Sequence, residues 1–363
     1  MNSVPRKSSA LHWSIRESTR RVIESIAPAL QITIGALLAY SLAHYGLQHA
    51  VPLLAMTVCI TSLGFSRDAR PRRILQTSIG MVVGIAISDV ALVLLGSGIL
   101  ELALVLLIVL LAARFISGSS AFALTAAIQA MIVQLLPAPP GGVFVRTIDG
   151  LIGGVMALVV TALIPRDPRG LARTDANKLF DFFIESLESL RLALRDVNMS
   201  LADDALRKVR RSQPLIDNWR MSLDSAVAIS RISPFLNKYR DELKGQVRLM
   251  RGMDLATRNL RVIVRRVDFL LKDGKARPYL SELCDQLADA VLLMREGLSD
   301  KEALESAQQQ LLEIIRQLDP KRFGIADQVR EASVLLLLRP LLVDLLCASG
   351  MTEDDARAEL PEV

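Results

Sequence analysis

Long apolar runs, broken by short polar turns, fill the first 165 or so residues of the chain. Between Ala27 and Ser66 there is no lysine, arginine, aspartate or glutamate. Charges and turn residues divide the region into six runs: Ala27–Leu47, Ala50–Phe65, Ile74–Leu95, Ile99–Phe115, Ser119–Leu136 and Val143–Ile164. A helix needs about 20 residues to cross the hydrocarbon core of a bilayer, and the second run is short by that measure. The pattern predicts about six transmembrane helices within residues 27–169.

A different pattern begins near Leu171, where charged residues recur every few positions. Apolar residues now repeat at three- and four-residue steps, as in Leu179, Phe183, Leu187, Leu190, Leu194 and Val197. This period is typical of amphipathic helices. Breaks predict six or seven such helices, and they lie near Ser200, Pro214, Pro234, 274–278, Ser299, Pro320 and Gly350. The apolar stretch from Val334 to Leu346 contains Arg339–Pro340, and we expect it to be a buried helix and not a seventh span.

The predicted fold class is therefore all-α, a polytopic membrane protein followed by a cytoplasmic helical bundle. Residues 1–26 are expected to form an interfacial amphipathic segment that lies on the inner membrane surface. Residues 27–169 form the transmembrane domain, and residues 170–350 form the cytoplasmic helical domain. The acidic residues at 351–363 are expected to be a flexible tail.

Positive charge is distributed unevenly around the apolar runs. Lysine and arginine gather before the first run, after the second, at the end of the fourth and after the sixth, whereas the alternate loops have almost none. The positive-inside rule then places both termini in the cytoplasm, in a plasma or inner membrane. The net charge of +5 is scattered, aromatic residues are few and no base-reading motif is present, so we expect basic loops facing anionic lipid and no nucleic-acid partner.

A repeat connects the third and sixth runs. Arg73, Gln76 and Gly80 open one in the same spacing as Arg146, Asp149 and Gly153 open the other. A three-helix unit repeated once must be inverted in the membrane, because three is odd, and inverted repeats are common in secondary transporters. Close helix packing alone explains the glycines, but it does not explain the arginine and the polar residue ahead of them.

Ionisable residues inside apolar runs are costly, so each requires a reason. Asp89, Arg146 and Asp149 are the clearest, while Glu101 is close enough to the outer interface to be simply solvated. Arg146 and Asp149 are three residues apart and share a helix face. They could form an ion pair that fixes helix register or could belong to an ion path, and both alternatives stay open.

Four further residues are candidates for a solute path. Arg73 lies at the inner mouth, where it is either a positive-inside loop charge or a substrate contact. Gln31, Gln76 and Gln129 could line a path for a polar solute, although such amides also join helices by hydrogen bonds.

Several chemistries have no sequence signal. There is no Walker A loop, the glycines at 150–154 lie inside an apolar run and not after a strand, and no Ser/His/Asp set or His/Cys cluster has usable spacing. We therefore expect no catalytic residues, no metal site, no cofactor and no enzymatic activity.

The motifs of the apolar half resemble those of the fusaric acid resistance and aromatic acid exporter family, which is related to the aluminium-activated malate transporters of plants. The resemblance rests on the Arg-x6-Gly-x3-Gly pattern from Arg73, the stretch from Arg146 to Gly154 and the exit from Leu163 to Pro168. The end of the chain, from Leu338 to Gly350, is also similar. The resemblance implies six membrane helices, a cytoplasmic helical domain, a homodimer and movement of organic anions.

The leading functional hypothesis is an exporter of aromatic or other organic carboxylates that is driven by the proton gradient. Arg146 and Arg73 would attract the carboxylate, and Asp89 and Asp149 would carry protons. One alternative is a passive organic-anion channel. Another, from a different class, is a membrane-anchored scaffold or regulatory protein whose soluble half binds a partner.

Overall fold

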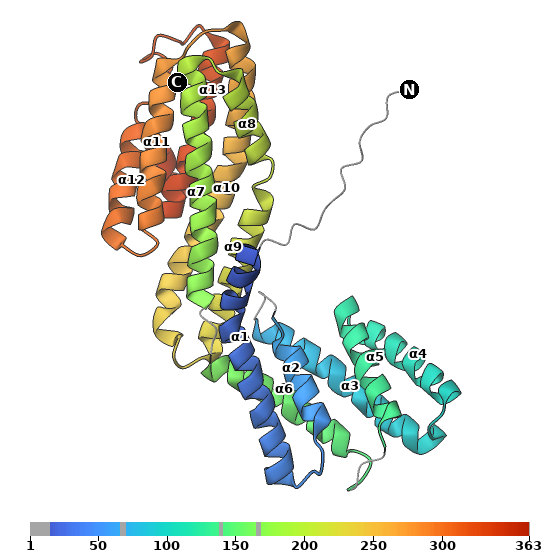
Figure 1. Cartoon of the computed structure of the whole chain (residues 1–363). Coiled ribbons are helices and arrows are strands. Elements are labelled where there is room, and N and C mark those ends of the chain that lie inside the picture. Colours follow the sequence, from blue (N-terminus) through green and yellow to red (C-terminus); the bar gives the residue numbers. More distant parts are fainter. Residues whose placement is uncertain (1–14, 66–69, 138–140, 165–167, 363) are drawn as a thin grey trace, which may run out of the picture. The chain divides into compact units, whose positions relative to one another are not determined.

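A computed structural model describes residues 15–65, 70–137, 141–164 and 168–362. The chain divides into two compact units, Met1–Arg166 and Asp167–Val363, and the described residues form helices with no strand (Figure 1). The predicted boundary after residue 169 lies three residues beyond this division.

The first unit contains one helix for each predicted span. These are α1 (Ile15–Ser41), which a π-helical turn (Leu42–Gly46) extends, α2 (Leu53–Leu63), α3 (Pro71–Leu95), α4 (Ile99–Ile116), α5 (Ser120–Leu135) and α6 (Val145–Leu163). By length and composition, α1 with its π-helical turn, α3, α4 and α6 can cross a membrane, while α2 and α5 are shorter apolar helices. The prediction of an all-α polytopic membrane protein is confirmed.

The start of the chain was predicted to lie on the membrane surface as far as residue 26. In the structure α1 runs without a break from Ile15 through Pro28 to Ser41, and the stretch apolar enough to cross a membrane begins at Ser25, close to the predicted boundary. Proline at position 28 removes one hydrogen-bond donor but does not end the helix here. Residues 1–14, which include most of the predicted segment, lie outside the described residues.

Buried side chains divide the first unit into two groups of helices, which we call the first and second lobes. The first lobe joins α1, α2 and α6, and the second joins α3, α4 and α5, while Ile74 at the start of α3 packs into the apolar cluster of the first lobe. A third apolar cluster lies where the lobes meet, and its members are Leu54, Val58, Met81, Ile85 and Val133. Across the same boundary, α3 packs directly on α6.

The packing of one lobe repeats that of the other. In the first lobe α1, α2 and α6 all pack on one another, and in the second α4, α5 and α3 do the same. In this correspondence α1 matches α4, α2 matches α5, and α6 of the first lobe matches α3 of the second. The helices α3 and α6 run antiparallel, since Gly150 meets Ile85 whereas Gly154, farther along α6, meets the earlier residue Ser78. Opposed third helices are the arrangement that an inverted repeat predicts.

Glycines set the closest approach of helices within each lobe. A Cβ atom added to Gly84 of α3 would lie 2.2 Å from the carbonyl oxygen of Ala126 in α5. One added to Gly153 of α6 would lie 2.4 Å from the carbonyl oxygen of Ala55 in α2. Because these obstacles are backbone atoms, a larger residue fits only if the helices separate. The small residues of the repeat thus serve close packing in both lobes.

The second unit is a helical bundle around one large apolar core. Its helices are α7 (Pro168–Asp196), α8 (Met199–Val209), α9 (Gln213–Ile232), α10 (Arg240–Leu270), α11 (Pro278–Glu296), α12 (Lys301–Ile315), α13 (Val329–Ser349) and α14 (Glu353–Ala358). They end close to the predicted breaks. Figure 1 shows α11 and α12 side by side along the bundle, and α7 packs against α11.

One helix of this bundle, α13, is also long and apolar enough to cross a membrane. However, 61% of its most apolar window is buried inside the unit, against 17–44% for the four such helices of the first unit. It packs on α10, α12 and α14. At the closest point, a Cβ added to Gly252 of α10 would lie 2.4 Å from the Cβ of Ala348. We therefore treat α13 as a core helix of the bundle.

The end of the chain differs from the flexible tail predicted for residues 351–363. The short helix α14 packs on α13. Glu359 forms a 2.8 Å ion pair with Arg316, and Arg339 donates a 2.7 Å hydrogen bond to the carbonyl oxygen of Pro361. An acidic composition suggested mobility, but Arg316 at the end of α12 and Arg339 within α13 supply partners that sequence proximity does not reveal.

The carboxylate of Asp344 in α13 provides a test of this core. Burial raises its pKa to about 6, although a 2.6 Å hydrogen bond from Asn259 of α10 lowers it in part. An unfolded aspartate has a pKa of about 3.9. The folded state therefore binds more protons between about pH 4 and pH 6, and its stability falls as the pH rises through that window.

We predict that Asp344→Asn stabilises the protein at pH 7.5 by about 1 kcal/mol, a value that allows for the water reaching this half-buried group. An asparagine oxygen can still accept the hydrogen bond from Asn259, without a charge to desolvate. Thermal unfolding of the detergent-solubilised chain at pH 4.5 and 7.5 measures the effect, which should be clearly smaller at the lower pH. Asp241→Asn, at an exposed site, is the matched control. A lower melting temperature for Asp344→Asn at pH 7.5 would contradict the prediction.

Candidate functional site

Polar side chains line the boundary between the two lobes. Among the described residues, four polar contacts cross it, and each joins one lobe to the other: Ser62 with Ser78, Thr57 with Gln129, Thr147 with Asp89, and Arg146 with the end of α5. We call this set of contacts the interlobe seam. Elsewhere the lobes meet through apolar side chains and glycines.

The seam runs along the length of the helices. Ser62 lies at the end of α2 and Ser78 near the start of α3, and their hydroxyl oxygens are 2.8 Å apart. Asp89 lies toward the opposite end of α3, and Thr147 lies in the first turn of α6. The seam therefore reaches from one end of the helix bundle to the other.

Arg146 closes one end of the seam. Its side chain is buried, and its guanidinium donates hydrogen bonds to the carbonyl oxygens of Val133 at 2.9 Å, Leu136 at 3.0 Å and Pro137. Those carbonyls lie at the C-terminal end of α5, where a helix leaves its last carbonyls without partners. Arg146 and Asp149 both lie in the part of the chain that the structure describes, and no ion pair within 4.0 Å joins them. The guanidinium thus caps a helix of the other lobe.

Asp149 is paired instead with a histidine from the turn before α2. Its Oδ1 atom lies 2.6 Å from Nδ1 of His49, and the carboxylate is 3% exposed. The backbone oxygen of His49 is in turn 2.8 Å from the Nδ1 atom of His44, whose ring stacks on Tyr40. Aspartate and histidine in contact at a buried site form a pair that can hold and release a proton.

Asp89 is the second buried carboxylate of the unit. Its Oδ2 atom accepts a 2.8 Å hydrogen bond from Thr147 across the seam, and Arg146 is close enough to attract it electrostatically. Nearby, Gln134 of α5 donates to the carbonyl oxygen of Ser88 at 3.4 Å, but its own buried Oε1 atom has no hydrogen-bond partner. A buried acceptor without a donor is costly, and it marks a place where a solute or water could donate.

The remaining predicted residues are divided between the seam and its surroundings. Gln129 lies in the seam, where its Oε1 atom is 3.5 Å from the hydroxyl of Thr57. Gln31 lies within the first lobe and donates to the carbonyl oxygen at the end of α6, 2.7 Å away. Gln76 is exposed on α3, and Arg73 is half-buried in the first turn of the same helix. The structure therefore brings Asp89, Arg146 and Gln129 into the seam, with Asp149 beside it.

Other participants gave weaker sequence signals. Thr147 sits between two charged candidates, and Ser78 lies between two candidate positions of α3, but a single hydroxyl in an apolar helix is common. His49 lies in a short turn, and only the folded structure brings it to Asp149, 100 positions away. A signal that could have found it is the pairing of a buried carboxylate with one of only three histidines in the chain.

Comparison with known proteins agrees with the resemblance drawn from the sequence. Residues 32–160 match the family model described as fusaric acid resistance protein-like. An uncharacterized protein of Corynebacterium glutamicum is 27% identical over 359 residues, which cover 97% of this chain and 92% of that protein. A protein of Mycobacterium bovis named "Putative arylamide transporter" is 29% identical over 159 residues, or 42% of this chain and 45% of that one. A protein of Mycobacterium tuberculosis with the same name matches equally.

We predict that Arg146→Ala lowers the stability of the protein by about 2–4 kcal/mol, because the carbonyls at the end of α5 lose their donors in an apolar setting. Adding Asp149→Asn should not restore stability, since Asp149 is paired with His49. Arg146→Lys should recover part of it, because an ammonium can still donate to one or two carbonyls. Thermal unfolding in detergent measures all three variants.

Arg114→Ala serves as the matched control, because Arg114 is exposed and bonds only to the carbonyl oxygen of Gly118 within the described residues. Rescue of Arg146→Ala by Asp149→Asn would show that the two residues are ion-pair partners after all. An unchanged melting temperature for Arg146→Ala would show that the cap is dispensable.

Proposed function

Because residues 32–160 of this chain form a fusaric acid resistance protein-like domain, we propose that the protein is a membrane transporter that exports aromatic or other organic carboxylates. The observation that carries the proposal is the interlobe seam. It provides polar side chains along the whole boundary between two lobes of equivalent packing. The name of the mycobacterial relatives supports an aromatic solute.

The proposed mechanism is movement of one lobe against the other. Apart from those of Arg146, the hydrogen bonds across the seam are few and each has a single hydroxyl as its donor, so exchanging them for water or solute costs little. Within each lobe, by contrast, glycines hold backbones in direct contact. Parting of the lobes at one end and then at the other would expose the seam alternately to the two sides of the membrane.

Charges at one end of the seam fit an organic anion and a proton. We propose that the carboxylate of the solute approaches Arg146 and that the aromatic ring lies against the apolar cluster between the lobes. The pair of His49 and Asp149, together with Asp89, would take up protons from the outer side and so couple transport to the proton gradient. We further propose an inner membrane location with both termini cytoplasmic and a homodimer.

A passive anion channel remains the second candidate, because the same basic group at the end of the seam would attract anions without coupling. A membrane-anchored scaffold is the third, since the second unit is as large as the first. Flux measurements distinguish among the three. Proton-dependent flux selects the exporter, flux without proton dependence selects the channel, and no flux selects the scaffold.

We predict that purified protein in liposomes moves benzoate or 2-naphthoate when a pH gradient is imposed. Asp149→Asn and Asp89→Asn should each reduce that flux at least tenfold without changing the melting temperature by more than a few degrees, because each removes a proton-binding carboxylate. Glu101→Gln, in the first turn of α4, is the matched control and should retain full flux. Full, pH-dependent flux in both aspartate variants would remove these residues from the mechanism.

A second test addresses lobe movement. Ser62→Cys combined with Ser78→Cys, with Cys59 replaced by alanine, places two thiols where the hydroxyls are 2.8 Å apart. We predict that oxidation links the lobes and abolishes flux, and that a reductant restores it. Either single cysteine variant should be insensitive to oxidation. Full flux through the cross-linked protein would show that the lobes do not need to part there.

A further inference from the structure

A groove opens on the surface of the second unit between α10 and α13. Its volume is about 520 Å³, which lies within the range of small-molecule sites. The walls are mainly apolar and contain Val262, Phe269, Leu336 and Leu337, with Arg265 and Arg266 among the lining residues. Val262 is 49% exposed and Phe269 is 57% exposed, so water covers a substantial apolar surface here. An exposed patch of this kind indicates a binding site more often than chance.

The two arginines of the groove have no acidic partner. Within the part of the chain that the structure describes, no hydrogen bond or ion pair engages Arg265. Arg266 donates from Nε to the hydroxyl of Ser333 at 2.9 Å, which fixes the guanidinium against α13 and leaves its terminal nitrogens for another acceptor. Asp268, the next acid along α10, forms no ion pair within 4.0 Å with either of these described arginines.

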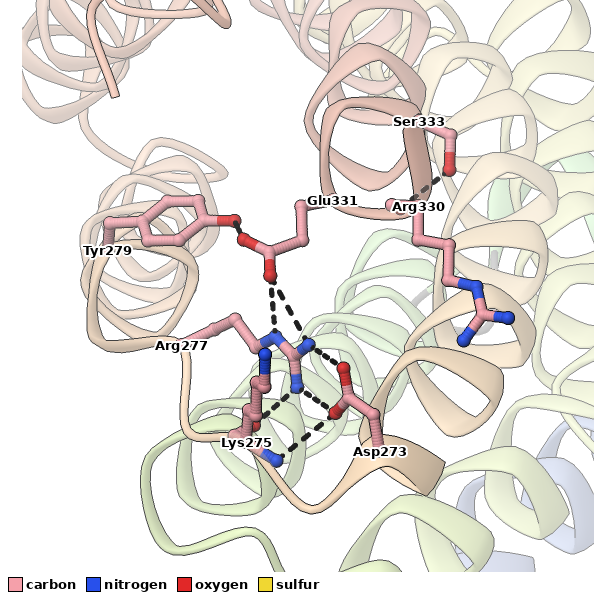
Figure 2. Close-up of polar contacts among 7 residues, drawn as sticks. All are labelled: Asp273, Lys275, Arg277, Tyr279, Arg330, Glu331 and Ser333. Atoms are coloured by element: carbon pink, nitrogen blue, oxygen red, sulfur yellow. Dashed lines mark hydrogen bonds and ion pairs between the residues drawn. The ribbon is translucent and has the colours of Figure 1, made fainter. Parts of the chain in front are cut away.

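The nearest acid on α13 is directed elsewhere. Figure 2 shows Glu331 pointing toward Arg277 and Tyr279, on the side of α13 opposite Ser333. The hydroxyl of Tyr279 donates to Glu331 at 2.6 Å, and the buried guanidinium of Arg277 donates to it at 3.3 Å. Arg277 also binds Asp273, which holds the pKa of that carboxyl well below its usual range. Asp273 and Glu331 thus belong to one network around Arg277, and the two arginines leave the groove cationic.

One charge near the groove reinforces this character. The ammonium of Lys272 lies 4.4 Å from the ring centroid of Phe269, so the ring already accepts a cation at its face. An anion in the groove would meet the guanidiniums of Arg265 and Arg266 on α10, with the ammonium of Lys272 close by in the turn that follows that helix. Apolar walls, an aromatic ring and paired guanidiniums without carboxylates are the complement of a small aromatic carboxylate.

We propose that the groove between α10 and α13 binds a small aromatic carboxylate, whose ring packs against Phe269 and Leu337 and whose carboxylate is held by Arg265 and Arg266. The choice of ligand class rests in part on the proposed transport function. The groove belongs wholly to the second unit and includes no residue of the interlobe seam. It is therefore a second, separate site through which the solute could act on its own transporter.

Binding of 2-naphthoate to the full chain in detergent, measured by isothermal titration calorimetry, tests the proposal. We expect Arg265→Gln and Arg266→Gln each to weaken one binding event about tenfold or more, and Phe269→Ala to weaken it similarly. Arg322→Gln, at an exposed position outside the groove, should bind as the unaltered protein does. The neutral analogue 2-naphthalenemethanol should bind at least tenfold more weakly than 2-naphthoate.

Two results would overturn the proposal. One is unchanged 2-naphthoate binding in the Arg265→Gln, Arg266→Gln double variant, and the other is equal binding of the neutral analogue. Liposome flux of 2-naphthoate in the same variants separates this proposal from the transport function. Binding that depends on the groove, without flux in the unaltered protein, would reject transport and keep the groove site. Normal flux with groove-independent binding would reject the groove site alone.

Discussion

A helix that ends within an apolar environment leaves carbonyl groups that lipid cannot satisfy. At the end of α5 the buried guanidinium of Arg146, at the start of the next helix, supplies hydrogen bonds to the last carbonyls. Because α5 and α6 belong to different lobes, one guanidinium both satisfies a helix end and connects the two halves of the unit. The positions of Asp89, Thr147 and Asp149 follow, since they flank this cap on α3 and α6.

Two kinds of contact have different roles in the membrane unit. Glycine-mediated backbone contacts, as at Gly84 and Gly153, fix the helices inside each lobe and do not tolerate displacement. Between the lobes, α3 packs on α6 through apolar side chains and glycines, and isolated side-chain hydrogen bonds and the bonds of Arg146 cross the boundary. The proposed movement of the lobes requires the contacts inside each lobe to persist while those across the seam are exchanged.

Much of this architecture could be predicted from the sequence, because length, hydropathy and turn residues decide where apolar helices begin and end. The six helices of the first unit and the breaks of the second follow the predicted pattern. The partners of individual side chains could not be predicted in the same way. Spacing placed Arg146 and Asp149 on one face, yet Arg146 bonds to the end of α5 and Asp149 pairs with His49. His49 reaches Asp149 only through packing of α2 on α6. Likewise, composition cannot show that Glu359 meets Arg316.

The exchange of helices between the lobes has a consequence for how such a unit could arise and fold. Each lobe takes two helices from one half of the membrane unit and its third from the other half. The first three helices alone therefore cannot complete a lobe, because α3 completes the lobe of α4 and α5. Two separate chains of three helices each could complete both lobes only by exchanging their third helices in an antiparallel dimer. In the single chain, α1 and α2 are synthesised before their partner α6. The first lobe is therefore complete only after α6, the last helix of the unit, has left the ribosome.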